Sequence, residues 1–126
     1  FNAYSNKALQ ESFQGKISKD IFSNNSYQCE DQPSKKSSRI TLAFKNSEFN
    51  FSHLDKKRNI SILWFGTYQL QGPGKLLLKT KEYRMKDIYG LRIKKDFELL
   101  FEVLGNASLF HLRSKQANYR CQRSRY

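Results

Sequence analysis

Apolar side chains recur at every second position over long stretches of this chain, and this period restricts its fold more than any other feature. Residues 60–70 form the longest such stretch, and residues 40–44 and 49–51 repeat the pattern. In the longest stretch one face is made of Ile60, Ile62, Trp64, Gly66, Tyr68 and Leu70, and the other carries Leu63 and Phe65. A period of two is typical of a β-strand, because successive side chains point to opposite faces of a sheet. The pattern therefore predicts an all-β fold.

Short turn signals separate the predicted strands. They lie at residues 46–47 (Asn-Ser), 71–74 (Gln-Gly-Pro-Gly) and 105–106 (Gly-Asn), where proline restricts φ and glycine accepts positive φ. We expect strands over residues 13–18, 39–45, 49–51, 60–70, 76–80, 88–93, 97–103, 107–112 and 119–122. Strands joined by short turns pair with their sequence neighbours, and closure removes exposed edges. The prediction is a small antiparallel meander barrel of about eight or nine strands, with a sandwich as the alternative.

The chain length of 126 residues suits one domain with a core of its own. We expect a single β-barrel domain over residues 1–126, with an N-terminal arm over 1–11 and a long polar loop over 22–38. A loop of this length either carries function or is a solvated connection. The longest apolar run, residues 60–66, is far shorter than the roughly 20 residues of a membrane-spanning helix.

The two cysteines, Cys29 and Cys121, are far apart in the sequence. A disulfide between them would enclose most of the domain and fits an oxidising compartment, so we expect an exported protein. The alternative is a pair of buried thiols in a cytosolic protein. The chain has no Cys-x-x-Cys, and His53 and His111 stand alone in the sequence. We therefore expect no metal site and no cofactor.

Positive charge is the strongest compositional feature. Twenty-three Lys and Arg residues stand against eleven Asp and Glu residues, which leaves a net charge of +12. A field of this sign attracts anionic partners, such as nucleic acid, acidic lipid headgroups, lipopolysaccharide or acidic polysaccharide. The alternative is that the basic side chains only solvate the barrel. The candidate anion-binding surface is Lys75, Lys79, Lys81, Arg84, Lys86, Arg92, Lys94 and Lys95.

Two other classes of function can be weighed from the residues. Tyrosines stand beside arginines at residues 83–84 and 119–120, as on barrels that stack bases on exposed aromatic rings. A basic nucleic-acid-binding β-barrel is therefore the alternative function. Catalysis finds little support, because the chain lacks the Gly-x-Ser-x-Gly, phosphate-loop and His-Glu-x-x-His patterns, and its carboxylates are scattered. We expect no enzyme activity.

Two segments carry a family resemblance: residues 39–51 (RITLAFKNSEFNF) and residues 65–78 (FGTYQLQGPGKLLL). They resemble the strands and turns of small lipocalin-like barrels in bacterial envelope lipoproteins, of the NlpE-like and META-type kinds. The resemblance covers roughly residues 38–113 and implies an envelope lipoprotein-type domain. The chain departs from the NlpE-like pattern because it has Cys29 alone where that pattern has Cys-x-x-Cys, so metal sensing does not carry over. A fainter similarity is to periplasmic lysozyme inhibitors, although a basic inhibitor would repel basic lysozyme.

The combined expectation is an exported, non-enzymatic, lipocalin-like barrel in the periplasm, at the outer membrane or outside the cell. It would act as a binding or interaction module for an apolar ligand, an anionic surface or a protein. An open barrel would place an apolar ligand against Trp64, Tyr68, Phe97 and Phe101. The alternative for these four residues is ordinary core packing, since small barrels are commonly filled by side chains.

Overall fold

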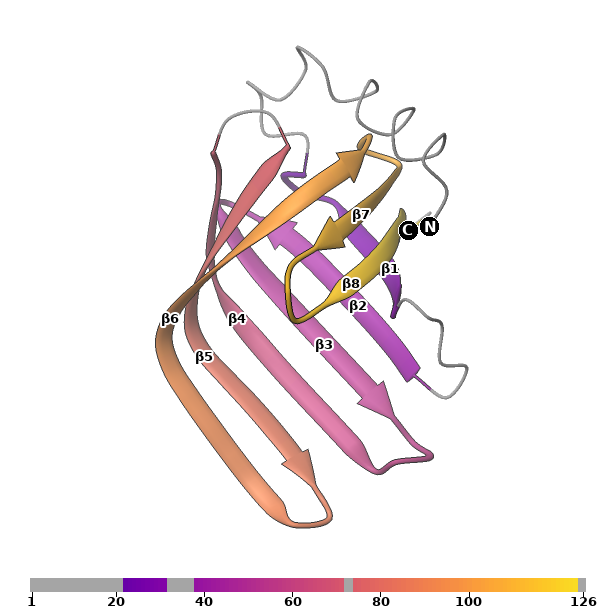
Figure 1. The fold of residues 1–126 in the computed structure, drawn as a ribbon, viewed down its shortest axis with the longest axis vertical. Coiled ribbons are helices and arrows are strands. Elements are labelled where there is room, and N and C mark those ends of the chain that lie inside the picture. The colour runs from indigo at the N-terminus through magenta and orange to yellow at the C-terminus, as the bar shows by residue number, and fades with distance from the viewer. Residues whose placement is uncertain (1–21, 32–37, 72–73, 125–126) are drawn as a thin grey trace.

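The computed structural model describes residues 22–31, 38–71 and 74–124, and these contain eight β-strands (Figure 1). The strands are β1 (Ser26–Asp31), β2 (Ser38–Lys45), β3 (Glu48–Asp55), β4 (Ile60–Leu70), β5 (Lys75–Asp87), β6 (Gly90–Gly105), β7 (Leu109–Arg113) and β8 (Asn118–Arg123). Each strand pairs antiparallel with its sequence neighbours, and β8 pairs with β1 to close the barrel. The predicted all-β antiparallel meander barrel is confirmed. No helix in the described ranges has the length and apolar character needed to cross a membrane.

The core fills the barrel with aromatic side chains, because alternating positions of the strands around the closed ring send apolar side chains inward. Phe22, Tyr27, Phe44 and Phe110 pack together at one end, with the centroids of contacting rings 4.8 to 6.1 Å apart. The burial pattern of β4 alternates as the sequence predicts, with Trp64 buried and Leu63 exposed.

The disulfide joins Cys29 to Cys121 across the closing seam of the barrel. The two residues lie directly opposite each other on β1 and β8, the first and last strands. Both side chains are buried. The predicted bridge is confirmed, and it holds together the one pair of the eight described strands that is not formed by sequence neighbours.

The region expected to be a long loop, residues 22–38, is different in the structure. Ser26–Asp31 is strand β1, and Cys29 therefore lies on a strand rather than in a loop. Its burial alternates, with Tyr27 and Cys29 inward and Gln28 and Glu30 outward. The sequence signal was weak because only two of its six residues are apolar. Pairing with β2 and β8 provides the backbone hydrogen bonds that stabilise it.

The segments expected to be separate strands at residues 88–93 and 97–103 belong to one strand, the sixteen-residue β6. Ile88 and Tyr89 form the turn that precedes it, where the Asp87 side chain accepts a hydrogen bond from the Tyr89 amide at 2.8 Å. The strand expected at 13–18, the arm at 1–11 and residues 72–73 of one predicted turn lie outside the described residues.

Candidate functional site

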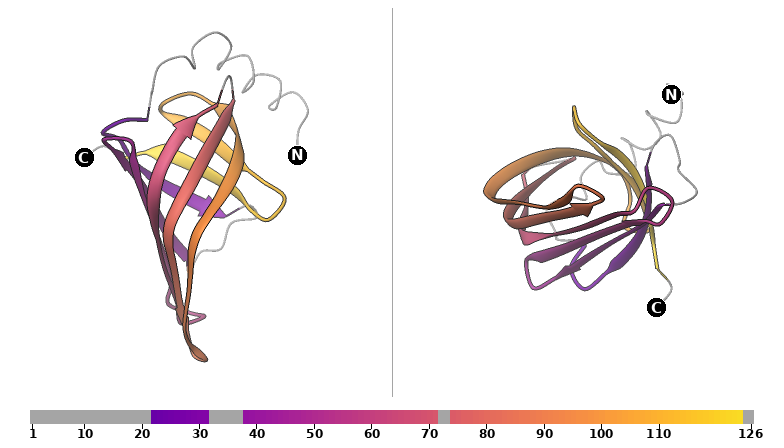
Figure 2. Two further views of the ribbon diagram at one scale, coloured as in Figure 1. Left: turned by 90° about the vertical axis from the view of Figure 1, so that its left-hand side faces the viewer. Right: turned by 90° about the horizontal axis from the view of Figure 1, so that it is seen from below.

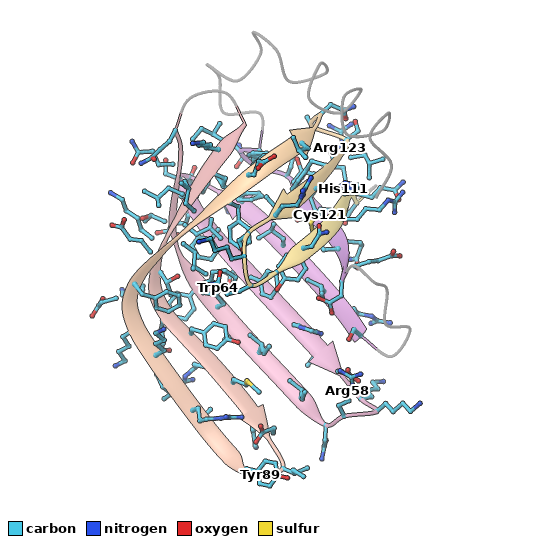
Figure 3. The ribbon with its side chains drawn as sticks, viewed as in Figure 1. Arg58, Trp64, Tyr89, His111, Cys121 and Arg123 are labelled. Atoms are coloured by element: carbon cyan, nitrogen blue, oxygen red, sulfur yellow. A yellow bond between two sulfur atoms is a disulfide. The ribbon has the colours of Figure 1, made fainter. Side chains whose placement is uncertain are left out.

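The barrel is closed at one end only. β6 pairs with β7 solely over Glu102–Gly105, while its remaining residues pair with β5. The short strands β1, β7 and β8 therefore complete a ring at one end, and the long strands β3 to β6 continue past it as a projecting sheet (Figures 1 and 2). Tyr89 lies at the tip of the β5–β6 hairpin, and Arg58 lies at the tip of the β3–β4 hairpin (Figure 3).

Two irregular positions mark the base of this projection. Phe65 pairs with Glu82 but Gly66 pairs with Thr80, so Lys81 is an extra residue in β5. On β6, Asp96 has φ of 56° and lies between Lys95 and Phe97, which pair with Glu82 and Thr80. The first position is a β-bulge, which bends a strand and shifts the alternation of its side chains. The positive φ of Asp96 accompanies this bulge on the neighbouring strand, without a register shift between β5 and β6. We call the two positions together the bulge region, and residues 82–95, beyond it, the projecting hairpin.

The bulge region changes which residues of β6 face the barrel axis: odd-numbered residues face it on the ring side, and even-numbered residues face it beyond. Beyond them, Lys94 lies opposite Tyr83, which lies opposite the buried Trp64, so all three share the inner face. Arg92, opposite Met85, also lies on this face. The apolar residues that alternate with these cations therefore point outward. The arrangement is the opposite of the sequence expectation, in which Leu and Ile point inward and the basic residues outward.

The outer face of the projecting sheet carries four exposed apolar side chains, those of Leu54, Leu63, Leu91 and Ile93, with the basic residues Arg84 and Lys86 of β5 between them. Leu63 and Ile93 lie opposite the same residue of β5, Arg84, and Leu91 lies opposite Lys86. Leu91 and Ile93 are 55% and 46% exposed. Sequence reasoning placed Leu63 on this face but missed Leu91 and Ile93, because alternation alone does not reveal a shift of phase.

Charged side chains of the projecting hairpin are mostly basic. Five basic and two acidic side chains give residues 82–95 a net charge of +3. Glu82 lies 3.1 Å from Arg84 and 3.8 Å from Lys95, and Asp87 pairs with Arg92. The Lys94 ammonium lies 4.7 Å from the centre of the Phe97 ring, a cation–π distance. These pairs hold the basic groups in place without cancelling their charge.

Aromatic rings line the inner face where the hairpin meets the core. Trp64 contacts Phe51 and Tyr83, with ring centroids 5.1 and 5.9 Å apart, and Tyr83 contacts Phe97 at 6.3 Å. Tyr119 packs on Phe51 at 5.5 Å. Burial, with smaller contributions from Asp31 and Tyr83, raises the pKa of the Tyr119 phenol to about 12. Burial also raises the pKa of Tyr83, against the opposing charge of Arg92.

The four residues expected to line an apolar pocket lie in or beside the filled core. Trp64, Tyr68 and Phe101 are buried core residues, and Phe97 is half-buried. The Trp64 indole N–H donates a hydrogen bond to the Thr80 hydroxyl at 2.6 Å. Trp64 contacts Phe101, Tyr68 contacts Phe44 and Phe97 contacts Tyr83, so each of the four rings packs against another aromatic ring.

The eight residues expected to form one basic surface are divided between two faces. Register and alternation put Lys79, Arg84, Lys86 and Lys95 on the outer face with Lys75, while Arg92 and Lys94 occupy the inner face. Lys81 is the bulge residue between them. The structure therefore brings Arg84, Lys86, Arg92, Lys94 and Lys95 together on one projecting hairpin, but it separates Lys75 and Lys79 from them along β5.

A polar cluster on β1, β2 and β3 has the residue types of a hydrolytic site. His53 Nε2 lies 3.0 Å from the Ser38 hydroxyl and 3.9 Å from Asp31, and Ser38 donates to Asp55 at 3.2 Å. In a catalytic triad the carboxylate bonds to the ring nitrogen that does not face the serine. Here Asp31 meets the same nitrogen as Ser38, so the geometry is not that of a triad. In the described ranges no three His, Cys, Asp or Glu side chains gather as metal ligands.

A comparison of the chain with protein-family models, curated proteins and solved structures finds no match.

Proposed function

We propose that this chain is an exported, non-enzymatic binding module that holds an anionic macromolecular partner on its projecting hairpin. One observation carries the proposal. Beyond the bulge region, β5 and β6 continue past the closed ring as a hairpin whose side chains are largely solvated on both faces and whose net charge is +3. Long strands in solvent leave backbone groups and apolar side chains uncovered. Such surface adds little to the stability of the fold but is typical of sites that bind a partner.

The export part of the proposal is supported by the Cys29–Cys121 disulfide. Structural disulfides persist in oxidising compartments and are rare in the reducing cytosol. The periplasm, the outer membrane and the extracellular space all satisfy this condition. An envelope lipoprotein-type role of the lipocalin-like kind is one form that the proposal takes.

The apolar-ligand alternative has less support, because the expected lining residues pack against other aromatic rings and three of them belong to the core. A small ligand would have to displace core aromatic rings such as Trp64 and Phe101, which costs several kcal/mol in lost packing. A macromolecule that binds at the surface makes no such demand. Nucleic acid remains a competing partner, since duplex or single strands also carry dense negative charge.

The test compares the unaltered chain with a shortened variant in which residues 84–93 are replaced by Asn-Gly. Tyr83 and Lys94 lie directly opposite each other, so a two-residue turn can connect them. Binding to polyglutamate, phosphatidylglycerol vesicles and duplex DNA is measured over a salt series. We expect salt-dependent binding to at least one of these probes, weakened at least about tenfold in the shortened variant.

The control is Lys56→Glu with Lys57→Glu, which reverses two exposed cations in the β3–β4 turn and leaves the hairpin unaltered. Equal binding by the shortened and unaltered chains would refute the hairpin as the binding surface. Tightest binding to DNA would identify the nucleic-acid alternative. A small molecule retained in native mass spectrometry would identify the apolar-ligand alternative.

A further inference from the structure

The free edge of β6 gives the proposed function a more specific form. Over Gly90–Phe101, β6 pairs with β5 on one side, and no strand among the described residues pairs with its other side. Residues 91–96 are all exposed. An edge strand presents a row of unpaired backbone N–H and C=O groups, to which an extended chain can add as a new strand.

A surface groove continues this edge. It has a volume of about 550 Å³ and lies where β6 diverges from β7, between residues 98–102 and the β7–β8 turn at residues 113–116. Leu99, Leu100 and Phe101 contribute its apolar lining. An added strand would run from the exposed edge into this groove, where apolar side chains find contacts.

The charges of the edge define what the added strand must carry. On the inner face a new strand would lie beside Arg92 and Lys94, and on the outer face beside Leu91 and Ile93. Opposite charges and apolar pairs on adjacent strands are favourable, each by roughly 0.2–1 kcal/mol. A segment in which acidic and apolar residues alternate satisfies both faces at once.

A second copy of the chain is a poor occupant of the same edge. Each copy has a net charge of +12, which opposes self-association. A two-fold axis at Ile93, in the most exposed part of the edge, would put Arg92 opposite Lys94 of the other copy. Like charges directly opposite each other destabilise a strand pair.

We therefore propose that β6 accepts, by strand addition, an extended segment of a partner protein in which acidic and apolar residues alternate. This inference rests on the proposed function, since it identifies the anionic partner as a polypeptide. Asp96, Glu98 and Glu102 lie toward the groove end of the edge, so we expect the acidic residues of the segment to lie beside residues 91–95. Its apolar end lies beside Leu99 and Phe101.

The experiment uses a fluorescent eight-residue peptide of alternating Glu and Val, measured by anisotropy with the full chain. Two further peptides carry backbone N-methyl groups, one on every Val and the other on every Glu. The amides of alternate residues point to opposite edges of a strand, so only one set faces β6. We expect one methylated peptide to bind as the parent does and the other to bind at least about tenfold more weakly.

Charge reversal provides the second arm. Arg92→Glu with Lys94→Glu changes two exposed residues, so the fold is expected to persist. This variant should bind the Glu-Val peptide more weakly than the unaltered chain does and a Lys-Val peptide more tightly. The control, Lys56→Glu with Lys57→Glu, should bind both peptides as the unaltered chain does. Circular dichroism confirms that each variant is folded.

The outcomes separate the two proposals. If the Glu-Val peptide binds but both methylated peptides bind equally, strand addition is wrong and the proposed function stands. If vesicles or DNA bind the hairpin while the peptide does not, the partner is not an acidic polypeptide. If no anionic probe distinguishes the unaltered chain from the shortened one, both proposals fail. Dimerisation of the unaltered chain that the shortened variant loses would assign the edge to a second copy.

Discussion

Gly66 lies on β4 where the extra residue of β5 comes closest. A Cβ atom at this position would lie 2.1 Å from the Lys79 carbonyl oxygen and 2.8 Å from the Lys81 amide nitrogen. Both neighbours are backbone atoms, which cannot move aside as a flexible side chain does. Glycine is therefore required by the close approach of the two strands at the bulge.

We predict that Gly66→Ala lowers the free energy of unfolding by more than about 2 kcal/mol, because the added methyl group must displace the backbone of β5. Urea denaturation measures the change. Thr67→Ala, at the neighbouring exposed position, is the control and should cost much less. An equal effect of the two substitutions would contradict the close approach.

Tyr119 is the residue whose ionisation should be most visible in stability. Its pKa is raised to about 12 in the folded chain, against 10.0 ordinarily, mainly by burial. The neutral phenol is favoured in the folded state, so this contribution is complete below pH 10 and is lost as the pH rises toward 12.

We predict that Tyr119→Phe makes stability less sensitive to alkaline pH. Relative to the unaltered chain, its free energy of unfolding should rise by about 2 kcal/mol between pH 9 and pH 12. Urea denaturation at a series of pH values measures the difference. Tyr89→Phe, at the exposed hairpin tip, controls for the loss of a hydroxyl group. Parallel pH profiles for Tyr119→Phe and the unaltered chain would argue against a raised pKa.

At the scale of elements, β5 and β6 each have two parts with different roles. On the ring side of the bulge region, Leu76, Leu78 and Phe101 pack in the core. Beyond the bulge region, every residue from 84 to 95 is exposed or half-buried, and none is buried. Burial of apolar area is the main source of stability, so the outer part should contribute little to it.

We predict that replacing residues 84–93 with Asn-Gly changes the free energy of unfolding by less than about 1 kcal/mol. The closing pair, Tyr83 and Lys94, stays in register, and the inward contact of Tyr83 with Trp64 is kept. Thermal and urea denaturation of the shortened chain measure the effect. A loss of several kcal/mol would mean that the hairpin serves the fold rather than binding.

For the whole molecule, stability depends on closure between β1 and β8. This pair joins segments that are 92 residues apart at the disulfide, whereas every other pair of strands in the described barrel joins sequence neighbours. Contacts between distant segments cost more loop-closure entropy than hairpins do. The covalent bridge reduces that cost by restricting the unfolded chain.

We predict that Cys29→Ala with Cys121→Ala lowers the free energy of unfolding by about 4 kcal/mol, the entropy expected for a loop of this length. Hydrogen exchange should show the largest loss of protection in β1 and β8, since hairpins such as β3–β4 close locally. A uniform loss over all strands would indicate that the barrel opens only as a unit. Unchanged stability would show that β1–β8 pairing suffices without the bridge.

Local alternation determined much of this protein by itself: the all-β class, the meander order and the inward face of β4, because the period of two depends only on neighbouring residues. The widely spaced cysteines likewise predicted the Cys29–Cys121 bridge. Tertiary structure decided the rest. A bulge arises from the pairing of two strands, so the sequence of one strand does not reveal it. The alternation around Asp96 therefore does not show that Arg92 and Lys94 face inward and Ile93 outward. Strand β1 and the free edge of β6 depend in the same way on which distant segments the barrel brings together.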